Sequence, residues 1–434
     1  MADWTTDSNE ALTLSLVRAT RDQEVLGDNE SYEGFHPTFT YPIYGEDEKL
    51  YGYRDLVIDL RFASGSLAQY LNVRYSSLAS SSTIDDVRGT LDKYIPEGYY
   101  TNEGEFLARV EEDAETFRPL GERIHSYTRL SPTSSSKGKG VETSLPEEDD
   151  DVIVYEVWHV SKLAKWETPG FKEYHRRMQL FILLYIEAGS YISEGEDPWE
   201  FVVLYEKRKR SGDPESETYH FIGYSTLYPF WCFPDKVRLR LSQFVILPPF
   251  QHQGHGSGLY DAIYRYVMSQ PQIAELTVED PAEAFEDLRD RNDLRMLLGH
   301  TTFMGEAFGS SGITSSSGGG KVGGVGRGRK MGKSGAKVKG KLGPPSDKVW
   351  MEKWRKDLKI AGRQYHRLIE MLLLLHLDPS DPRATRAYRL QVKERLYRFN
   401  YEILVQLEDK DRLEKLEETF HGLQADYQRL LSMI

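Results

Sequence analysis

The sequence predicts a mixed α/β (α+β) fold in which a mixed, mostly antiparallel sheet carries the functional site. Three observations support this prediction. Apolar runs rich in strand formers alternate with runs of helical periodicity over most of the chain. Two such runs, 201–205 and 220–227, follow each other as neighbouring strands of an antiparallel meander do. A third, 241–247, leads through a glycine-containing loop into an amphipathic helix.

The first 129 residues are predicted to form an N-terminal α/β domain. Residues 11–17 and 56–62 have the pattern of strands, and residues 84–94 and 105–117 contain good helix formers at helical spacing. Residues 130–151 then turn to Ser, Gly and Lys and to an acidic run. We expect a disordered surface insertion there.

A second domain is predicted over residues 152–306, followed by a flexible Gly/Lys-rich linker at 307–345. Its strands are expected at 152–158, 201–205, 220–227, 241–247 and 274–278, with a charged loop over 207–217. Its helices are expected at 171–188, at 257–269, and at 281–298 with Pro281 in the first turn.

Residues 346–434 are predicted to form a C-terminal three-helix unit with a structural role. Ser346 and Asp347 precede the first helix as capping residues do, and this helix is expected to continue to Leu372 and beyond. Pro379 then ends it, and two further helices complete the chain.

The charge distribution favours a basic partner. The 434 residues carry a net charge of −13. Residues 309–345 hold eight Lys and Arg and no acid, so the rest of the chain carries −21. An acidic body with one detached basic strip indicates a basic binding partner and argues against a nucleic-acid binder.

Several function classes are excluded by composition. No apolar stretch is long enough to span a membrane, and the first residues lack the pattern of a secretion signal. The single cysteine, Cys232, permits no internal disulfide and suits a reducing compartment, and its aromatic neighbours indicate a packed thiol. Clustered Cys and His are absent, so we expect no metal.

The most informative motif is the loop Gln251-His252-Gln253-Gly254-His255-Gly256 at a strand-to-helix turn. Free backbone N–H groups and the helix dipole bind anions at such a turn, and glycines let a phosphate approach closely. No Gly-Lys-Ser/Thr follows, and the spacing does not fit a dinucleotide fingerprint. The loop therefore predicts a cradle for a pyrophosphate such as that of coenzyme A.

The flanks of this loop identify a family. The run Leu241-Ser-Gln-Phe-Val-Ile-Leu-Pro-Pro-Phe-Gln-His-Gln-Gly-His-Gly-Ser and the run Leu276-Thr-Val-Glu-Asp-Pro-Ala-Glu-Ala-Phe-Glu-Asp-Leu-Arg-Asp-Arg-Asn-Asp closely resemble the type B histone acetyltransferase catalytic subunit. That enzyme belongs to the Gcn5-related N-acetyltransferase superfamily. The resemblance extends from about Asn9 to the C-terminus, apart from the two low-complexity segments. It implies the Gcn5-related N-acetyltransferase fold over 152–306 and a substrate-binding role for the N-terminal domain.

The resemblance implies an acetyltransferase that moves acetyl from acetyl-CoA to lysine ε-amines in the N-terminal tail of free, newly made histone four. Because a lysine amine has a pKa of about 10.4, direct attack requires a base. The family favours Glu279, at the end of the strand 274–278. Asp280 is either a helper or the N-cap of the following helix. Glu187 is either a supporting acid/base group or a surface residue at a helix end.

The family also implies binding residues. Main-chain contacts to pantetheine are expected from Phe244, Val245 and Ile246, and pyrophosphate contacts from Gln251, His252, Gln253, Gly254, His255, Gly256 and Ser257. Ala282 matches a coenzyme contact only through its backbone, and Arg291 either meets a phosphate or is a solvated helix charge. Histone contacts are expected from Glu46, Asp47, Glu48, Trp199, Tyr228, Pro229 and Phe230.

The implied partners are histone four with histone three as its dimer partner, and a WD-repeat histone-binding subunit, in cytoplasm and nucleus, with no direct nucleic-acid or membrane contact. Two alternatives stay open: a catalytically weak histone-binding or chaperone module, and an acetyltransferase for another basic protein or a small amine. Outside the resemblance, residues 326–337 have the Gly/Lys texture of a histone tail. They are either a plain linker or a pseudosubstrate or autoacetylation site held near the groove.

Overall fold

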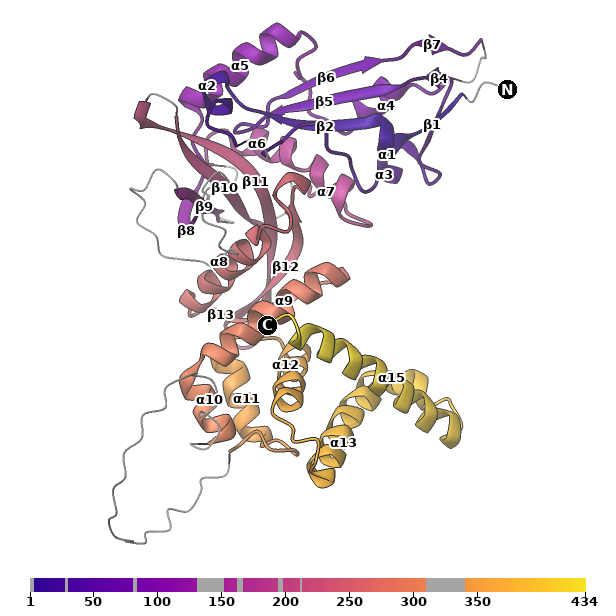
Figure 1. The fold of residues 1–434 in the computed structure, drawn as a ribbon, viewed down its shortest axis with the longest axis vertical. Coiled ribbons are helices and arrows are strands. Elements are labelled where there is room, and N and C mark those ends of the chain that lie inside the picture. Colours follow the sequence, from indigo (N-terminus) through magenta and orange to yellow (C-terminus); the bar gives the residue numbers. More distant parts are fainter. Residues whose placement is uncertain are drawn as a thin grey trace, which may run out of the picture. The chain divides into compact units, whose positions relative to one another are not determined.

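The computed structural model describes residues 4–27, 30–80, 84–130, 152–161, 167–193, 198–210, 213–309 and 340–434. The chain divides into two compact units, 1–272 and 273–434 (Figure 1). The predicted insertion, apart from Leu130, and most of the predicted linker, including the tail-like residues 326–337, lie outside the described residues. Among the described residues, no helix combines the length and apolar character needed to cross a membrane.

The first unit contains a small mixed sheet near its N-terminus. Its order is β2-β5-β6, with β2 (Leu12–Val17) parallel to β5 (Val57–Ala63) and β6 (Gln69–Arg74) antiparallel to β5. Alternation of side chains places Leu12, Leu14, Ile58, Leu60 and Phe62 on one buried face. Two short sheets accompany it: β1 (Thr5–Asp7) with β3 (Lys49–Tyr51), and β4 (Tyr53–Arg54) with β7 (Ser77–Leu78).

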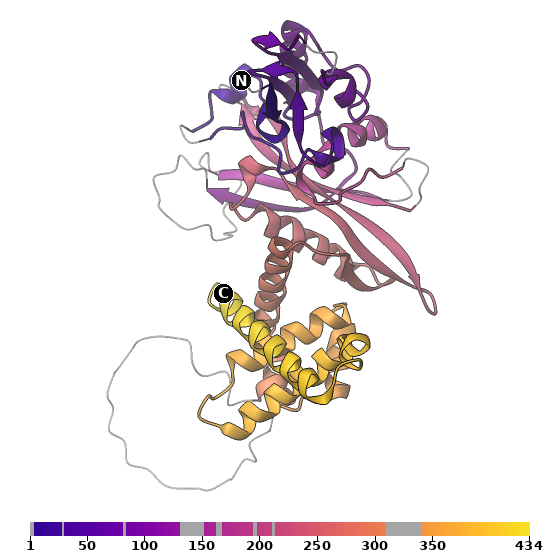
Figure 2. The same cartoon turned by 90° about the vertical axis from the view of Figure 1, so that its right-hand side faces the viewer.

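A larger, strongly twisted antiparallel sheet follows (Figure 2). In the first unit its order is β12-β11-β10-β9-β8. The strands are β8 (Glu122–Leu130), β9 (Val152–Val160), β10 (Glu200–Arg210), β11 (Asp213–Cys232) and β12 (Lys236–Ile246). These observations confirm the mixed α/β class and the mostly antiparallel sheet.

The prediction of a charged loop over residues 207–217 is wrong, because β10 extends to Arg210 and β11 begins at Asp213, and these two residues pair across the antiparallel ladder. Three of the four cations in this segment, Lys207, Arg208 and Arg210, are paired with carboxylates, and the fourth, Lys209, is exposed. Lys207 lies 2.8 Å from Glu217, and Arg210 lies 3.2 Å from the buried Asp22. Arg208 pairs with both Glu206 and Glu30.

Helices cover these sheets in the first unit. They are α1 (Ser8–Ala11), α2 (Thr20–Gln23), α3 (Tyr41–Tyr44), α4 (Val87–Leu91), α5 (Glu103–Thr116), α6 (Phe171–Met178), α7 (Leu180–Tyr185) and α8 (His255–Ser269), with a 3₁₀ turn η1 at Pro248–Phe250. The single helix expected at 171–188 is therefore two helices, and α4 is shorter than residues 84–94. The second of the two ends at Tyr185, because the Leu184 carbonyl accepts from the amides of Thr38 and Phe39 and the chain turns extended at Ile186.

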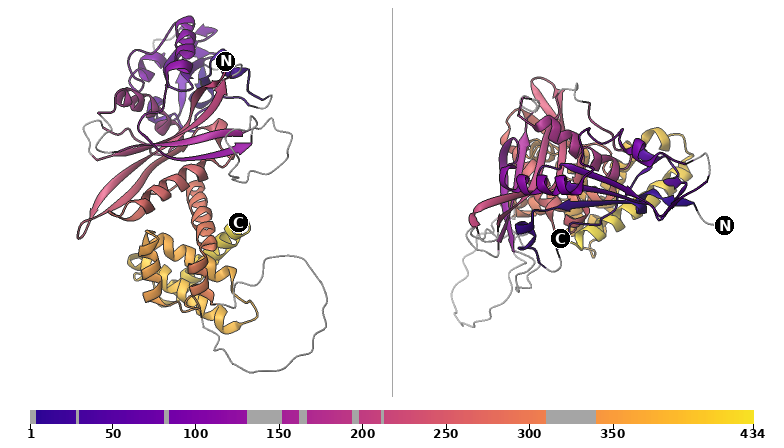
Figure 3. Two further views of the ribbon diagram at one scale, coloured as in Figure 1. Left: turned by 90° about the vertical axis from the view of Figure 1, so that its left-hand side faces the viewer. Right: turned by 90° about the horizontal axis from the view of Figure 1, so that it is seen from above.

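The second unit is mainly helical (Figure 3). It contains β13 (Ile273–Val278), α9 (Glu283–Gly299), α10 (Thr301–Phe308), α11 (Lys348–Asp357), α12 (Gly362–Leu375), α13 (Pro382–Phe399), α14 (Tyr401–Leu404) and α15 (Asp409–Leu431). The expected first helix of the C-terminal unit is split into α11 and α12, because Ile360 forms a β-bridge with Leu276. Asp347 caps α11 as predicted, accepting from the amides of Val349 and Trp350.

Candidate active site

The turn between β12 and α8 exposes a helix start that no side chain caps. After β12 the chain forms η1 and then the turn that leads to His255, the first residue of α8. The N-cap is Gly254, whose φ of 82° lies in the left-handed region that favours glycine. Because Gly254 has no side chain, it cannot bind the N–H groups of the first helical turn. These groups and the helix dipole are suited to an anion.

Two glutamine side chains hold this loop against the end of β12. The Nε2 atom of Gln251 donates to the Ile246 carbonyl at 2.8 Å, and that of Gln253 donates to the Pro249 carbonyl at 2.8 Å. His252 is exposed, with a φ of 59°. Gln251 and Gln253 therefore shape the loop. The Gln251 amide donates to the Pro248 carbonyl at 3.1 Å, so the main chain of Gln253 is the part of this pair that is available to a ligand.

Strand β8 lies against the first turn of α8, and two glycines permit this approach. A Cβ at Gly258 would lie 2.7 Å from the Tyr127 ring, and a Cβ at Gly254 would lie 2.8 Å from the Arg129 guanidinium. Tyr127 and Arg129 share one face of β8, since they are two residues apart. That step rises by about 6.6 Å, which matches the roughly 6 Å between residues 254 and 258 of a helix.

His255 is a packing residue under the loop. Its side chain is 1% exposed, its Nδ1 lies 3.0 Å from the Tyr127 hydroxyl, and its ring packs on Tyr155 with centroids 4.5 Å apart. Burial and then the charge of Arg129 lower the pKa of His255 to about 3. The imidazole is therefore neutral near pH 7, and only its backbone is placed to serve an anion.

The strand edge expected to hold pantetheine contains a β-bulge. Thr226 faces Gln243 and Leu227 faces Leu241, so Ser242 is the extra residue of β12. Beyond the bulge, Phe244 faces Ser225 across the β11–β12 ladder. Val245 and Ile246 are buried. The bulge re-aims β12 just before the three residues predicted to contact the coenzyme.

The segment after α7 connects this edge to the acidic loop. The Gln243 side chain donates to the Ser190 carbonyl at 2.8 Å, and the Ala188 amide donates to the Tyr41 hydroxyl at 2.6 Å. Tyr41 belongs to α3, which leads directly into Glu46. Glu187 is exposed beside this connection. The structure thus brings the neighbourhood of Glu187, the acidic triplet and the bulged strand into one region.

The three acids of the triplet differ in their surroundings. Glu48 accepts from the amides of Thr40 (2.7 Å) and Tyr41 (3.0 Å) and so stabilises the start of α3. Asp47 accepts from the Tyr51 hydroxyl at 3.1 Å. Glu46 and Asp47 are exposed. Glu48 is mainly a structural group, which leaves Glu46 and Asp47 as the accessible carboxylates.

The predicted aromatic contacts form one cluster. Trp199 and Tyr228 have ring centroids 4.9 Å apart, and Tyr228 and Phe230 have centroids 4.7 Å apart. The guanidinium of Arg240 lies over Phe230 at 4.6 Å. Pro229, which lies between Tyr228 and Phe230 in the sequence of β11, is half-buried. Arg240 therefore shows that these rings already hold one cation. Sequence reasoning did not identify this residue.

The acidic pair and the last two residues predicted to contact the coenzyme, Ala282 and Arg291, lie in the second unit. Glu279 and Asp280 are exposed directly after β13. The interpretation of Asp280 as a helix cap is wrong: α9 begins two residues later than expected, with Ala282 as N-cap, and Asp280 has a φ of 36°. Pro281 therefore precedes the helix. Arg291 is half-buried in α9, and its Nε donates to the Asp287 carbonyl at 3.2 Å.

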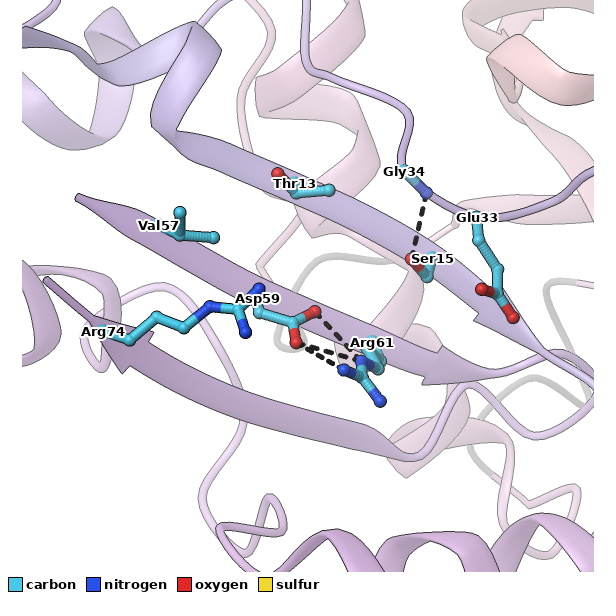
Figure 4. A pocket seen from close by; sticks show the side chains of 8 residues that line it. All are labelled: Thr13, Ser15, Glu33, Gly34, Val57, Asp59, Arg61 and Arg74. Carbon is cyan, nitrogen blue, oxygen red and sulfur yellow. Dashed lines mark hydrogen bonds and ion pairs between the residues drawn. The ribbon is translucent and has the colours of Figure 1, made fainter. Parts of the chain in front are cut away.

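A separate polar pocket of about 350 Å³ lies on the outer face of the N-terminal sheet (Figure 4). Its lining includes Asp59, which accepts from Arg61 at 2.7 Å, and Ser15, which accepts from the Gly34 amide at 3.1 Å. Arg74 and Glu33 also line it. None of the predicted site residues belongs to this lining.

Comparison with known proteins decides the family. Residues 4–187 match the model for the histone acetyl transferase HAT1 N-terminus, and residues 329–378 match that for the fungal HAT1 C-terminal region. The "histone acetyltransferase type B catalytic subunit" of Cryptococcus neoformans var. neoformans is 48% identical over 100% of this chain and 98% of the relative. The chain belongs to the family of histone acetyltransferase type B catalytic subunits.

Two further relatives carry the same name. The subunit of the same name from Mycosarcoma maydis is 44% identical over 91% of this chain and 82% of its own, and that from Kluyveromyces lactis is 32% identical over 99% and 93%. A crystal structure of an aminoglycoside acetyltransferase from a soil metagenomic sample aligns with a TM-score of 0.23 and 12% identity, covering 32% of this chain and 86% of that chain. As a member of the family, the chain is an acetyltransferase.

Sequence reasoning missed the residues of β8 that lie beside the loop. Tyr127 and Arg129 are about 125 residues away from Gly254 in sequence, just before the predicted insertion. The available signal was the strand alternation of residues 125–129, which places both on one face. Only tertiary structure shows that this face meets the start of α8.

Proposed function

We propose that the chain transfers acetyl from acetyl-CoA to lysine ε-amines in the N-terminal tail of free, newly made histone four, by direct attack in a ternary complex. The observation that carries the proposal is the uncapped start of α8 after the bulged strand β12, in a chain of this family. Coenzyme phosphates are anions of the kind that bind at such a helix start.

The residues present fit acetyl-CoA. The loop Gln251–Ser257 contributes main-chain N–H groups for the pyrophosphate, and the main chain of Phe244, Val245 and Ile246 lines the pantetheine arm. Ala282 contributes through its backbone. Arg291 is assigned to a phosphate, which its half-buried position permits.

The chemistry assigned to this chain is proton removal and positioning. Glu279 accepts a proton from the lysine ammonium, directly or through one water. The neutral amine nitrogen then forms a bond to the acetyl carbonyl carbon, the carbon–sulfur bond breaks, and the coenzyme thiolate leaves and takes up a proton. Asp280 and Glu187 are the supporting acids in this proposal. No acyl-enzyme is required.

The acidic loop and the aromatic cluster are the proposed histone contacts. Glu46 and Asp47 supply accessible carboxylates for tail lysines and arginines, and Glu48 holds their loop in place. The cluster of Trp199, Tyr228 and Phe230 already places one guanidinium over its rings, which supports a preference for cationic side chains.

Histone three, as the dimer partner of histone four, and a WD-repeat histone-binding subunit complete the proposed complex, in cytoplasm and nucleus. The β11–β12 turn is the proposed contact with that subunit. Trp231 is 72% exposed and Phe233 is 80% exposed there. Two neighbouring exposed aromatic side chains are typical anchors of a protein interface.

The proposal is tested by measuring acetyl transfer to a free histone-four tail peptide, to spermidine and to lysine-free peptide. We expect transfer to the tail peptide, with kcat/KM at least tenfold above that for spermidine. Faster transfer to spermidine would favour a small-amine enzyme. Coenzyme binding without transfer, even with the WD-repeat subunit present, would favour a histone-binding module.

A further inference from the structure

We propose that Arg129, at the end of strand β8, binds a phosphate group of the coenzyme. The inference rests on the proposed function, since it assigns an additional binding residue to the same site. Neither the loop motif nor the family resemblance pointed to this residue.

The environment of Arg129 lacks a counter-charge among the described residues. Its Nε is buried without a hydrogen-bond partner. Its guanidinium makes a cation–π contact with Tyr127, whose ring centroid lies 5.1 Å from the guanidinium carbon. Two buried arginines of this unit do have a carboxylate partner: Arg18 lies 2.8 Å from Glu206, and Arg210 lies 3.2 Å from Asp22. A partly buried guanidinium without an anion is costly, and a bound anion removes that cost.

The position of Arg129 is the one that a phosphate ligand requires. Its Nη1 lies 2.8 Å and its Nη2 2.9 Å from the point where a Cβ on Gly254 would lie. Gly254 is the N-cap of α8, so the guanidinium lies beside the uncapped amides. The neighbouring His255 is neutral near pH 7 and adds no competing charge. Arginine and helix amides together provide two independent sources of positive potential.

The guanidinium is also held in place before a ligand binds. The guanidinium carbon of Arg129 lies 5.1 Å from the centroid of the Tyr127 ring. That ring is fixed by the contact of its hydroxyl with His255 and by stacking on Tyr155 with centroids 5.2 Å apart. A planar donor fork that is already ordered loses little side-chain entropy on binding phosphate. Arg129 is therefore assigned as a coenzyme-binding residue and not as a catalytic one.

The test is calorimetric titration of coenzyme A into the wild type, Arg129→Met and Arg129→Gln, with Arg265→Gln as the matched control. Arg265 is exposed on α8, ten residues beyond the first residue of that helix. We expect the Arg129 variants to bind about tenfold more weakly, as is usual for loss of one charge-assisted hydrogen-bond pair. Arg265→Gln should bind within about twofold of the wild type.

Two further ligands show which phosphate of the coenzyme Arg129 binds and control for a folding defect. If Arg129 binds the 3′-phosphate, the loss disappears with 3′-dephospho-coenzyme A; if it binds the pyrophosphate, the loss persists. With S-acetylpantetheine, which lacks all phosphates, kcat/KM for tail peptide should be the same in Arg129→Met and wild type. A fall there equal to that with acetyl-CoA would mean a structural defect and would overturn the assignment.

Different results would contradict the proposed function and the assignment of Arg129. Wild type that does not bind coenzyme A at all would contradict the proposed function, and the assignment of Arg129 with it. Wild type that binds, with Arg129→Met within about twofold of it, would overturn the assignment of Arg129 alone.

Discussion

The Tyr127 hydroxyl lies 3.0 Å from Nδ1 of the buried His255, the first residue of α8. This contact belongs to a stack of aromatic side chains that supports the loop proposed to bind the coenzyme. Phe250, in the turn before the loop, packs near His255 and on Tyr32, and the Arg18 guanidinium lies 4.0 Å from the Tyr32 ring centroid. The conformation of the loop therefore depends on residues from the N-terminal segment and from β8.

His255 should make stability depend on pH. Because burial, assisted by Arg129, lowers its pKa to about 3, the unfolded chain binds a proton at a higher pH than the folded chain does. The stabilisation is complete above the unfolded pKa of about 6.5 and is lost as pH falls toward the folded value. Between pH 7 and pH 5 we expect this group to lower the free energy of unfolding by about 2 kcal/mol.

Urea unfolding of wild type and His255→Gln at both pH values measures this effect. The variant should lose most of that pH-dependent difference, whereas His252→Gln, which removes an exposed histidine of the same loop, should keep it. An unchanged pH dependence in His255→Gln would contradict the account.

The buried cluster around Glu206 should be essential for stability. Burial alone would raise the pKa of Glu206, but the charges of Arg18 and Arg208 outweigh it and lower that pKa well below its usual range. Glu206→Gln leaves buried arginine charge without compensation, and we expect a loss of about 3–5 kcal/mol. Glu217→Gln removes a half-exposed partner of Lys207 and should cost at most about 0.5 kcal/mol. Equal losses of the free energy of unfolding in the two variants, measured by chemical denaturation, would refute the essential role of the Glu206 cluster.

Gly254 should not tolerate alanine, in contrast to Gly299. Alanine at 254 meets both the strain of a left-handed φ and the Arg129 guanidinium, whereas nothing lies within 4 Å of a Cβ at Gly299. We expect Gly254→Ala to lower the free energy of unfolding by about 1–2 kcal/mol and to weaken coenzyme A binding. Gly299→Ala should leave both unchanged or slightly increase stability, as thermal unfolding and titration would show.

The exposed hairpin turn should matter for the partner and not for the chemistry. Trp231→Ala combined with Phe233→Ala should weaken binding of the WD-repeat histone-binding subunit at least tenfold while transfer to free tail peptide stays unchanged. Tyr75→Ala, which removes an aromatic side chain 45% exposed elsewhere in the first unit, is the control. Unchanged subunit affinity in the double variant would remove this surface from the interface.

Local patterns predicted those parts of the structure that local physics determines. The strand 241–247, the helix after the glycine loop and the cap at Asp347 follow from apolar spacing and short-range hydrogen bonds. The glycine loop at a strand-to-helix turn also follows, because positive φ and an uncapped helix start need residues that lie next to each other in sequence.

Long-range contacts determined the rest. The charges of residues 207–217 resemble a solvated loop until the fold brings in their partners: Asp22 from α2, Glu30 from the segment after it, and Glu156 from β9. The 171–188 helix ends early because of amides from residues 38 and 39. Arg129 was not predicted because its position beside Gly254 depends on the packing of β8 on α8.

The central claim is acetyl transfer to a histone-four tail lysine with Glu279 as base, and its most direct test is turnover of wild type, Glu279→Gln and Glu283→Gln over a pH series. Glu283 is an exposed glutamate in the first turn of α9 and serves as the matched control. We predict that Glu279→Gln loses at least a hundredfold in kcat, regains part of it at high pH where free lysine is neutral, and still binds coenzyme A as wild type does. Near-normal turnover in Glu279→Gln at neutral pH would contradict the claim and transfer the role to Asp280 or Glu187.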